Sequence, residues 1–280
     1  NTSIGLTLSG GGAKGLAHIG ILKAIDSAGL KIDYITGTSM GAIIGALYAV
    51  GYSGKQIEQL CKTLEWDLLF SNQIPLKALS MEEKNQYARF ALELPYINNK
   101  IKLPTGVIEG QELNMKFMEL FFHVFDKKKF SDLPISFQCM ATDLETGNLV
   151  VLDSGNLVKA LRASMAIPSV FTAVSINDKK LVDGGLVRNF PVKNVREMGA
   201  GITIGSNVSG GLSSKDEIIN PVDVILQMAF FKEAADFKEE LPLTDIYIHM
   251  PLTKYNMTSF SSSKEIMETG IETGNNYFPL

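Results

Sequence analysis

Histidine and cysteine are scarce in this sequence, and positive charge is not in excess. The 280 residues include three histidines and two cysteines, with a formal net charge of −4. Cys61 and Cys139 lie far apart and belong to no C-x-x-C pair, so no metal or redox motif is present. The acidic balance argues against nucleic acid as a partner. It also gives no general attraction to anionic lipid headgroups.

Long apolar runs and targeting segments are also missing. No 18 consecutive apolar residues occur, and the richest stretches, Ala42–Val50 and Val224–Phe231, are too short to span a bilayer. The chain opens NTSIGLTLSGGG without a visible signal peptide and stops at NNYFPL just after a predicted helix. We interpret it as an excised or mature piece of a longer protein. A chain that never carried a leader is the alternative.

The first 50 residues alternate between predicted strands and helices. Ile4–Leu8 and Tyr34–Thr36 are predicted strands, while apolar spacing predicts helices over Lys14–Ala28 and Ala42–Val50. In such a βαβα unit the two strands lie parallel, and their carboxyl ends open on one edge of the sheet. The alternation continues along the chain, which predicts one α/β domain over residues 1–280, with 255–280 as a helical C-terminal tail.

Two glycine motifs fall on that predicted edge. The first, G-G-G-A-K-G at 10–15, follows the first strand. The second, G-T-S-M-G at 37–41, has the G-x-S-x-G pattern that often places a nucleophilic serine on a strand-to-helix turn. Adjacent strands lie about 4.8 Å apart, so the N–H groups of Gly11 and Gly12 are expected beside the Ser39 hydroxyl, as an oxyanion hole.

Other interpretations of the glycine motifs are weaker. Both motifs could be tight turns without a chemical role. The first also fits a dinucleotide-binding loop, but the second strand ends in Gly37, Thr38 and Ser39 rather than in the acidic residue that binds a ribose. It is not a phosphate-binding P-loop, because glycine follows Lys14.

The base that would activate Ser39 is left open by these patterns. His249 comes late enough to complete a Ser-His-Asp triad in the chain order of α/β-hydrolases. His18 and His123 are better explained as packed helix residues. Asp183 ends a predicted strand and is followed by two glycines, which would present its carboxylate at a sheet edge. An ordinary D-G turn is the alternative for Asp183.

Three blocks of the sequence together resemble the patatin-like phospholipases. They are S-G-G-G-A-K-G at 9–15, G-T-S-M-G at 37–41 and D-G-G at 183–185, in the order of that family. GLAHIGILKAI and RASMAIPSVFTAV extend the similarity, which covers most of residues 4–250. The resemblance implies a three-layer α/β/α fold with a mostly parallel central sheet, related to α/β-hydrolases but distinct from them. Some members are exported passengers of outer-membrane autotransporters.

The resemblance also implies a chemistry. Ser39 matches the nucleophile and Asp183 the general base, while Gly10, Gly11 and Gly12 match the oxyanion loop. The implied activity is phospholipase A or lysophospholipase hydrolysis through an acyl-enzyme, without metal or cofactor. Lys14 stands where many members carry arginine, which we expect to shift anion contacts without abolishing activity. A non-catalytic lipid-binding module is the competing function.

The expected substrate is a phospholipid or another acyl ester, reached by transient contact with a membrane surface. Residues 72–105 are interpreted as a cap that meets lipid, or alternatively as a helical insertion packed on the domain. We expect a bacterial chain, secreted or displayed at the outer membrane or cell surface, with a cytoplasmic chain as the alternative; the sequence does not indicate an oligomeric state. Apolar side chains that we expect to bind the acyl group are Met40, Met165, Ile167, Pro168 and Phe171, together with the helix that carries Leu113, Phe117, Leu120, Phe121 and Phe125. Ordinary core packing is the alternative for most of them.

Overall fold

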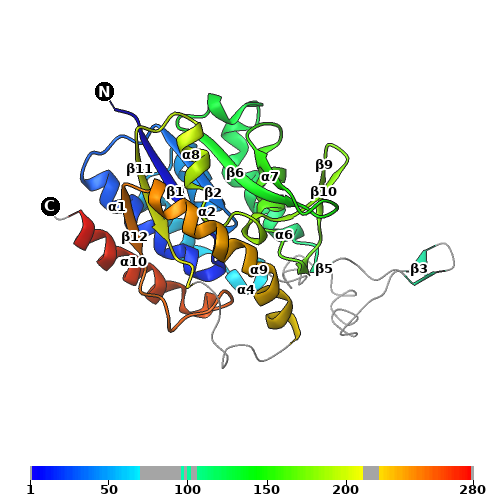
Figure 1. Cartoon of the computed structure of the whole chain (residues 1–280). Helices are drawn as coiled ribbons and strands as arrows, with labels where there is room; N and C mark the ends of the chain where they lie inside the picture. The colour runs from blue at the N-terminus through cyan, green and yellow to red at the C-terminus, as the bar shows by residue number, and fades with distance from the viewer. Residues whose placement is uncertain (1, 70–95, 98–99, 102–105, 211–220, 279–280) are drawn as a thin grey trace, which may run out of the picture.

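The computed structural model describes residues 2–69, 96–97, 100–101, 106–210 and 221–278. An eight-stranded sheet runs through the described part of the chain (Figure 1). Its order is β12 (Ile246–His249), β11 (Ile202–Asn207), β1 (Ile4–Leu8), β2 (Tyr34–Thr38), β6 (Ser136–Asp143), β10 (Lys179–Asp183) and β9 (Val174–Ile176), with β7 (Leu149–Leu152) also paired to β6.

The sheet has a parallel part and an antiparallel part that share β6. Strands β12, β11, β1, β2 and β6 pair in that order and run parallel to one another. The predicted parallel pairing of the first two strands is therefore confirmed. Strands β10 and β7 run antiparallel to β6, and β9 runs antiparallel to β10. The antiparallel hairpin β9–β10 turns at Asn177 and Asp178, both with positive φ.

Helices cover both faces of the sheet. Successive side chains of a strand point to opposite faces. A Cβ at Gly5 would lie 2.6 Å from Val195 on α8 (Val192–Glu197), whereas the Leu8 side chain reaches Gly45 on α2 (Met40–Ala49). Because Gly5 and Leu8 face opposite ways, α8 and α2 lie on opposite faces, and the expected three-layer arrangement is present.

The remaining elements surround this framework. The helices are η1 (Gly12–Ala17), α1 (His18–Ser27), α3 (Gly54–Thr63), α4 (Trp66–Leu69), α6 (Gln111–Phe121), η2 (Phe122–Val124), η3 (Phe130–Asp132), α7 (Leu157–Ser164), η4 (Gly184–Leu186), α9 (Pro221–Glu240), η6 (Leu241–Leu243), η7 (Phe260–Ser262) and α10 (Ser263–Tyr277). Short strands β3 (Tyr96–Ile97) and β4 (Lys100–Ile101) pair with each other, as do β5 (Gly106–Ile108) and β8 (Ser169–Phe171).

The first predicted helix differs from the observed one. Residues 12–17 form the 3-10 helix η1, and a regular α-helix begins only at His18. A Cβ at Gly15 would lie 2.5 Å from the Met40 side chain, so this turn approaches α2 more closely than another residue would allow. The interpretation of residues 72–105 as a cap falls mostly outside the described residues.

The C-terminal helix α10 packs directly on α1 rather than standing apart from the domain. A Cβ at Gly270 would lie 2.1 Å from the carbonyl oxygen of Ala17, and one at Gly274 would lie 2.6 Å from that of Gly20. Small residues four apart allow two helix backbones to approach closely. Ile266 and Met267 of α10 are buried as well. Residues 263–277 therefore belong to the packed domain.

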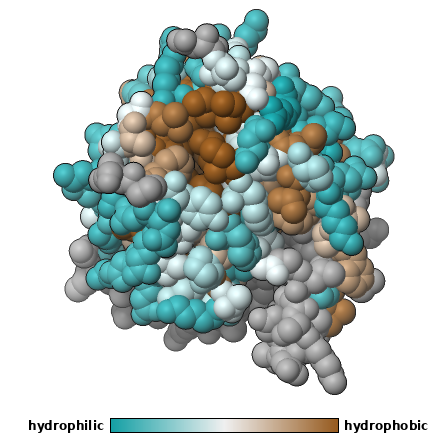
Figure 2. Space-filling model, turned by 60° about the vertical axis from the view of Figure 1, so that its left-hand side comes forward, coloured by the Kyte–Doolittle hydropathy of each residue, from teal (hydrophilic) through white to brown (hydrophobic). Residues whose placement is uncertain are grey.

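The apolar core fills the space between the sheet and its helices. Buried side chains of β1, α1 and α2, such as Leu6, Ile21 and Ile44, form one continuous cluster. On the face shown in Figure 2 most side chains are hydrophilic, and the apolar ones gather in compact areas. Within the described residues, no helix is both long and apolar enough to cross a bilayer.

Candidate active site

Ser39 occupies a strained turn between β2 and α2. Its φ is 53° and its ψ is −123°, a conformation that costs free energy for a residue with a Cβ. The two motif glycines explain how the turn fits. A Cβ at Gly37 would lie 2.6 Å from the carbonyl oxygen of Gly41, and a Cβ at Gly41 would lie 2.4 Å from that of Leu8. The G-x-S-x-G spacing therefore reflects close backbone packing around the serine.

The glycine loop lies beside this turn. The Cβ position of Gly10 is 3.2 Å from Cβ of Ser39, so the loop and the serine are in contact. Gly12 has a φ of +55°, and a Cβ there would lie 2.3 Å from the carbonyl oxygen of Met257. The same carbonyl accepts the Ala13 N–H at 2.8 Å. A segment just before η7 thus holds the loop in place from outside.

The three loop glycines are not equivalent as donors. The Gly10 N–H already donates to the carbonyl oxygen of Asn189 at 3.2 Å. Gly12 opens η1, and the first N–H groups of a helix have no partner inside it. The Gly10 N–H therefore holds the loop to Asn189, and Gly11 and Gly12 stay the predicted oxyanion donors.

Asp183 ends β10 and is buried, with 5% of its surface exposed. Its Oδ1 accepts the Gly185 N–H at 2.7 Å, and its carboxylate also accepts a hydrogen bond from the Ser39 side chain. Burial raises the pKa of Asp183 to about 6, an effect that these two hydrogen bonds partly oppose. A Cβ at Gly184 would lie 2.3 Å from the carbonyl oxygen of Met140, so the D-G-G turn must pass close to β6.

The register of the sheet explains how Ser39 and Asp183 meet. Thr38 of β2 is paired with Met140 of β6, and Asp183 of β10 is paired with Ala141 of β6. Strand β7 occupies the other edge of β6 across residues 139–142, so β2 and β10 pair with the same edge of β6, one after the other. Ser39 directly follows β2 and Asp183 ends β10, so the two residues lie next to each other along that edge.

Two further polar side chains support the turn, and the sequence analysis did not identify either. Ser164 accepts the Ser39 N–H on its hydroxyl at 3.0 Å. The side-chain amide of Asn189 donates to the carbonyl oxygen of Gly10 at 3.3 Å. Ser164 lies inside RASMAIPSVFTAV, which carried the family resemblance, whereas Asn189 lies just after the D-G-G block. A place in or near those stretches was the available signal, but the partners of both side chains depend on the folded chain.

The histidine contacts that the structure gives are to groups other than Ser39. His18 is buried, with Nδ1 2.8 Å from Oγ of Ser206 and Nε2 2.9 Å from the carbonyl oxygen of Ser9, and burial lowers its pKa to about 4. His249 is exposed on β12, which is three strands from β2, or roughly 14 Å. His123 contacts the carbonyl oxygen of Val50 at 3.2 Å. The triad interpretation that used His249 therefore finds no support in the geometry.

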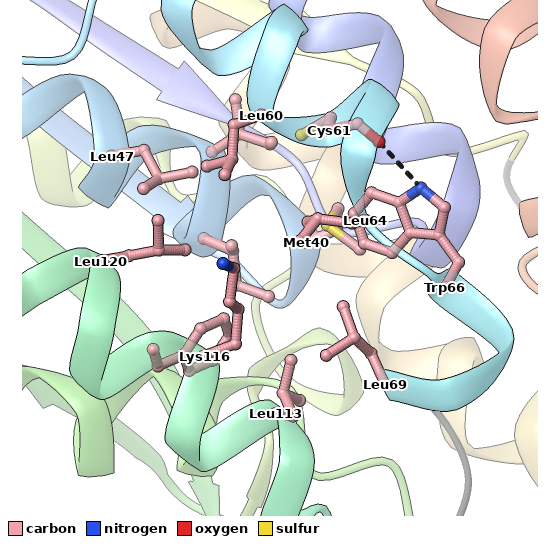
Figure 3. A pocket seen from close by; sticks show the side chains of 13 residues that line it. Met40, Leu47, Leu60, Cys61, Leu64, Trp66, Leu69, Leu113, Lys116 and Leu120 are labelled. Carbon is pink, nitrogen blue, oxygen red and sulfur yellow. Dashed lines mark hydrogen bonds between the residues drawn. The ribbon is translucent and has the colours of Figure 1, made fainter. Parts of the chain in front are cut away.

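An apolar pocket begins next to the serine turn, at Met40 (Figure 3). Its free volume is about 20 Å³, so the side chains that line the pocket leave little empty space in it. The indole N–H of Trp66 donates to the carbonyl oxygen of Cys61 at 3.2 Å along one wall. The lining residues come from α2, α3, α4, α6 and the segment between α3 and α4: Met40, Ile43, Ile44, Leu47, Leu60, Cys61, Leu64, Trp66, Leu69, Leu113, Lys116, Phe117 and Leu120.

The predicted acyl-binding side chains divide into two groups. This pocket is lined by Met40, Leu113, Phe117 and Leu120, whereas Met165 and Phe171 are buried outside its lining and Pro168 is half-buried outside it. Phe171 packs under the Arg162 guanidinium, at 5.1 Å from the ring centre. The candidates on α2 and α6 therefore share one pocket, and an acyl-binding role for any of these side chains stays a prediction.

The part of the chain that the structure describes shows neither a cluster of metal ligands nor an exposed thiol. No three histidine, cysteine or carboxylate side chains converge there as a metal would require. Cys61 and Cys139 are free thiols in the core, and burial raises both pKa values, that of Cys61 to about 12. They are therefore protonated at neutral pH.

These features describe an α/β protein in which a strained serine turn, a glycine loop and a buried aspartate meet at the centre of a mixed sheet. The chain belongs to the patatin-like phospholipase family, whose model matches residues 6–196. The resemblance inferred from the three sequence blocks is therefore confirmed.

Sequence relatives include fungal and insect proteins. The lysophospholipase NTE1 of Pyricularia oryzae is 27% identical over 97% of this chain, and the neuropathy target esterase sws of Drosophila melanogaster is 28% identical over 99%. This chain spans only 18% and 19% of those two proteins. Autotransporter passengers are not among these relatives, so that part of the expectation is not borne out. Bacterial origin and a surface location stay predictions.

Solved structures agree on the fold. VipD from Legionella pneumophila matches with a TM-score of 0.50 at 14% identity, over 98% of this chain and 67% of that one. ExoU of Pseudomonas aeruginosa, in its complex with SpcU, matches with a TM-score of 0.50 at 16% identity, over 99% of this chain and 52% of that one. Similarity at these identities establishes a shared fold.

Proposed function

We propose that this chain is a lipid acyl hydrolase that cleaves carboxylic esters of phospholipids or lysophospholipids. The observation that carries the proposal is the convergence of the Ser39 hydroxyl, the buried Asp183 carboxylate and the glycine loop at one point. Membership of the patatin-like phospholipase family and relatives named lysophospholipase agree with a lipid ester as substrate.

In the proposed first half-reaction, Asp183 accepts the proton of the Ser39 hydroxyl as Oγ attacks the ester carbonyl carbon. The N–H groups of Gly11 and Gly12 stabilise the negative charge on the carbonyl oxygen. The tetrahedral intermediate then breaks its bond to the alcohol or lysolipid. Asp183 returns the proton to that leaving group, and the acyl chain stays on Ser39 as an ester.

In the second half-reaction, water replaces the alcohol. Asp183 takes a proton from the water as its oxygen attacks the acyl-enzyme carbonyl. The second tetrahedral intermediate releases the fatty acid, and the proton returns to Ser39. One aspartate therefore serves as base and acid in both halves, and no histidine is required.

The electrostatics of the site suit this role. An aspartate in water has a pKa near 3.9 and is a weak base at neutral pH. Burial raises the pKa of Asp183 to about 6, which brings its basicity closer to the working pH while leaving it mostly ionised at pH 7. The positive φ of Ser39 directs its side chain out of the turn, where the carboxylate can reach it.

The apolar pocket is the proposed acyl-chain site. Met40 follows the nucleophile directly and lines the pocket together with Leu113 and Phe117 of α6. Because the free volume is about 20 Å³, the side chains of α3, α4 and α6 have to move apart before an acyl chain enters. Methionine and leucine side chains can rearrange at modest cost.

The test of this function is Ser39→Ala, assayed on a soluble short-chain ester and on lysophosphatidylcholine. We expect hydrolysis of both to fall by at least about 10³-fold, because the nucleophile is lost, with unchanged thermal unfolding. His249→Ala is the matched comparison and should retain nearly full activity. Retained turnover in Ser39→Ala would refute the proposal, and a large loss in His249→Ala would restore the triad.

The same assay separates the non-catalytic alternative. If the unmodified chain binds lysophosphatidylcholine but hydrolyses neither ester, the chain is a lipid-binding module. An intact serine, glycine loop and aspartate favour catalysis over that alternative, since a module that only binds lipid has no need for all three.

A further inference from the structure

Helix α6 is apolar on two opposite sides. Its inner side buries Leu113, Phe117, Leu120 and Phe121, and the first three of these line the pocket. Its outer side carries Met115 and Met118, which are 48% and 60% exposed. An ordinary surface helix shows one apolar stripe and a polar opposite face. The outer side of α6 therefore needs a separate explanation.

The apolar outer side continues into η2 and the residue after it. Phe122 is 73% exposed and Phe125 is 70% exposed, and their rings stack with centres 6.0 Å apart and planes 12° from parallel. The two largely exposed phenyl rings and the two exposed methionines together form one apolar area on the surface. Such areas mark interaction sites more often than isolated exposed apolar residues do.

Three consecutive lysines follow this area, at 127–129. Nζ of Lys128 lies 5.7 Å from the centre of the Phe125 ring. Lys127 is 3.8 Å from the Asp126 carboxylate, whereas no ion pair of Lys128 or Lys129 is found within the described ranges. Glu119 is held by Lys116 at 2.8 Å. Other acidic side chains near this surface are Glu112, Asp132 and Asp153.

We propose that this α6–η2 surface, made of Met115, Met118, Phe122, Phe125 and Lys127–Lys129, docks on an anionic phospholipid bilayer. This inference rests on the proposed function in one respect: docking would bring the proposed acyl pocket to its lipid substrate. Phenyl and methionine side chains would enter the boundary between headgroups and acyl chains, and the lysines would contact anionic headgroups.

The chemistry of this surface indicates that its binding partner is an anionic membrane. Lysine stems can lie along apolar surface while their ammonium groups reach outward, an arrangement suited to a membrane interface. The chain as a whole has a net charge of −4, so attraction to anionic lipid requires a local group of lysines such as this one. Because α6 also lines the pocket, docking this helix would place a pocket wall at the lipid interface.

The experiment measures co-sedimentation with vesicles, using Ser39→Ala so that no lipid is consumed. Vesicles of phosphatidylcholine alone are compared with vesicles that also contain phosphatidylserine. Phe122→Ser with Phe125→Ser should weaken binding to the mixed vesicles by about tenfold or more. Lys128→Gln with Lys129→Gln should weaken it by about fivefold per lysine and remove most of its salt sensitivity.

The matched control is Ile246→Ser with Tyr277→Ser, two exposed apolar side chains on β12 and α10, away from α6 in Figure 1. It should bind vesicles like the parent. Equal binding by the phenylalanine variant and this control would overturn the proposal. A concentration-dependent dimer that the phenylalanine variant alone loses would also overturn it, since the surface would then bind a second copy.

The assays distinguish a failure of the docking proposal from a failure of the proposed hydrolase function. With Ser39 intact, the phenylalanine variant should hydrolyse a soluble short-chain ester at the parental rate, but should lose about tenfold on mixed vesicles. If no ester is hydrolysed by any variant, the proposed function fails, while vesicle binding still decides the docking surface.

Discussion

The two parts of the central sheet contribute different kinds of group to the site. The parallel part, through β1 and β2, supplies backbone donors and a serine on turns built from glycine. The antiparallel part, through β10, supplies a buried carboxylate. The first contribution depends on the absence of side chains and on positive φ angles, whereas the second depends on taking a charge out of water. The two parts should therefore respond differently to substitution.

The largest expected effect is on the antiparallel part. Asp183→Asn should lower kcat/KM by about 10³-fold, because the general base is lost. At pH 7 it should also raise the free energy of unfolding by roughly 1–3 kcal/mol, because a buried charge is removed. The gain should vanish below about pH 4, where Asp183 is protonated in both the folded and the unfolded chain. Activity assays and urea unfolding at several pH values would measure these effects.

Asp178→Asn is the control for that substitution. It makes the same charge change on the same hairpin, but Asp178 is exposed. Activity and stability should both stay near the parental values. An Asp183→Asn variant that is inactive and also less stable would instead indicate that the carboxylate holds the hairpin together.

The next effect concerns the parallel part. Gly12→Ala should lower kcat by about 10²-fold, because a Cβ would meet the Met257 carbonyl and displace an oxyanion donor. Gly147→Ala is the matched control, since Gly147 has a φ of +68° and no atom within 4 Å of the added Cβ. Both variants should lose about 1 kcal/mol of stability to backbone strain, and Gly12→Ala should lose more because its Cβ also collides with the Met257 carbonyl. Equal activity in the two variants would contradict a role for the loop in catalysis.

The smallest effect is on pH dependence and tests the link between the two parts. Only the ionised Asp183 can accept the Ser39 proton, so kcat/KM should rise with pH and level off above about pH 7. Below the pKa of about 6 it should fall about tenfold per pH unit. Steady-state rates on a substrate that does not ionise would give the profile.

Histidine could imitate that profile, because its ordinary pKa is near 6.5. His249→Ala and His123→Ala should therefore leave the midpoint unchanged. A profile that shifts or disappears in either variant would assign the titration to imidazole.

Local patterns predicted much of the fold. Strand β1 begins and ends at the expected residues, because its run is bounded by Ser3 on one side and by Ser9 and Gly10 on the other. The transition from η1 to α1 was missed, since it depends on a contact between Gly15 and Met40 that no local pattern contains. The candidate site shows the same division. Sequence motifs predicted Ser39 and Asp183, but they did not predict the supporting roles of Ser164 and Asn189, which depend on contacts between distant segments.

The acyl-binding candidates show a similar division. Met40 and the helix candidates Leu113, Phe117 and Leu120 line one pocket, whereas Met165 and Phe171 lie outside its lining. The pocket combines α2 with α3, α4 and α6. Which apolar side chains become a pocket wall depends on how helices distant in sequence pack together, and apolarity alone does not distinguish a wall from the core.

The sequence by itself determined the residue types and the local backbone: glycines where a Cβ would collide, a serine on a strand-to-helix turn, and an aspartate at the end of a strand. Only the tertiary structure decided which of these groups meet. The pairing of Thr38 with Met140 and of Asp183 with Ala141, both on the edge of β6 that β7 leaves free, puts serine and carboxylate next to each other. Burial then raises the pKa of the carboxylate. Strand register and burial arise from contacts between distant segments, so short-range spacing does not encode them.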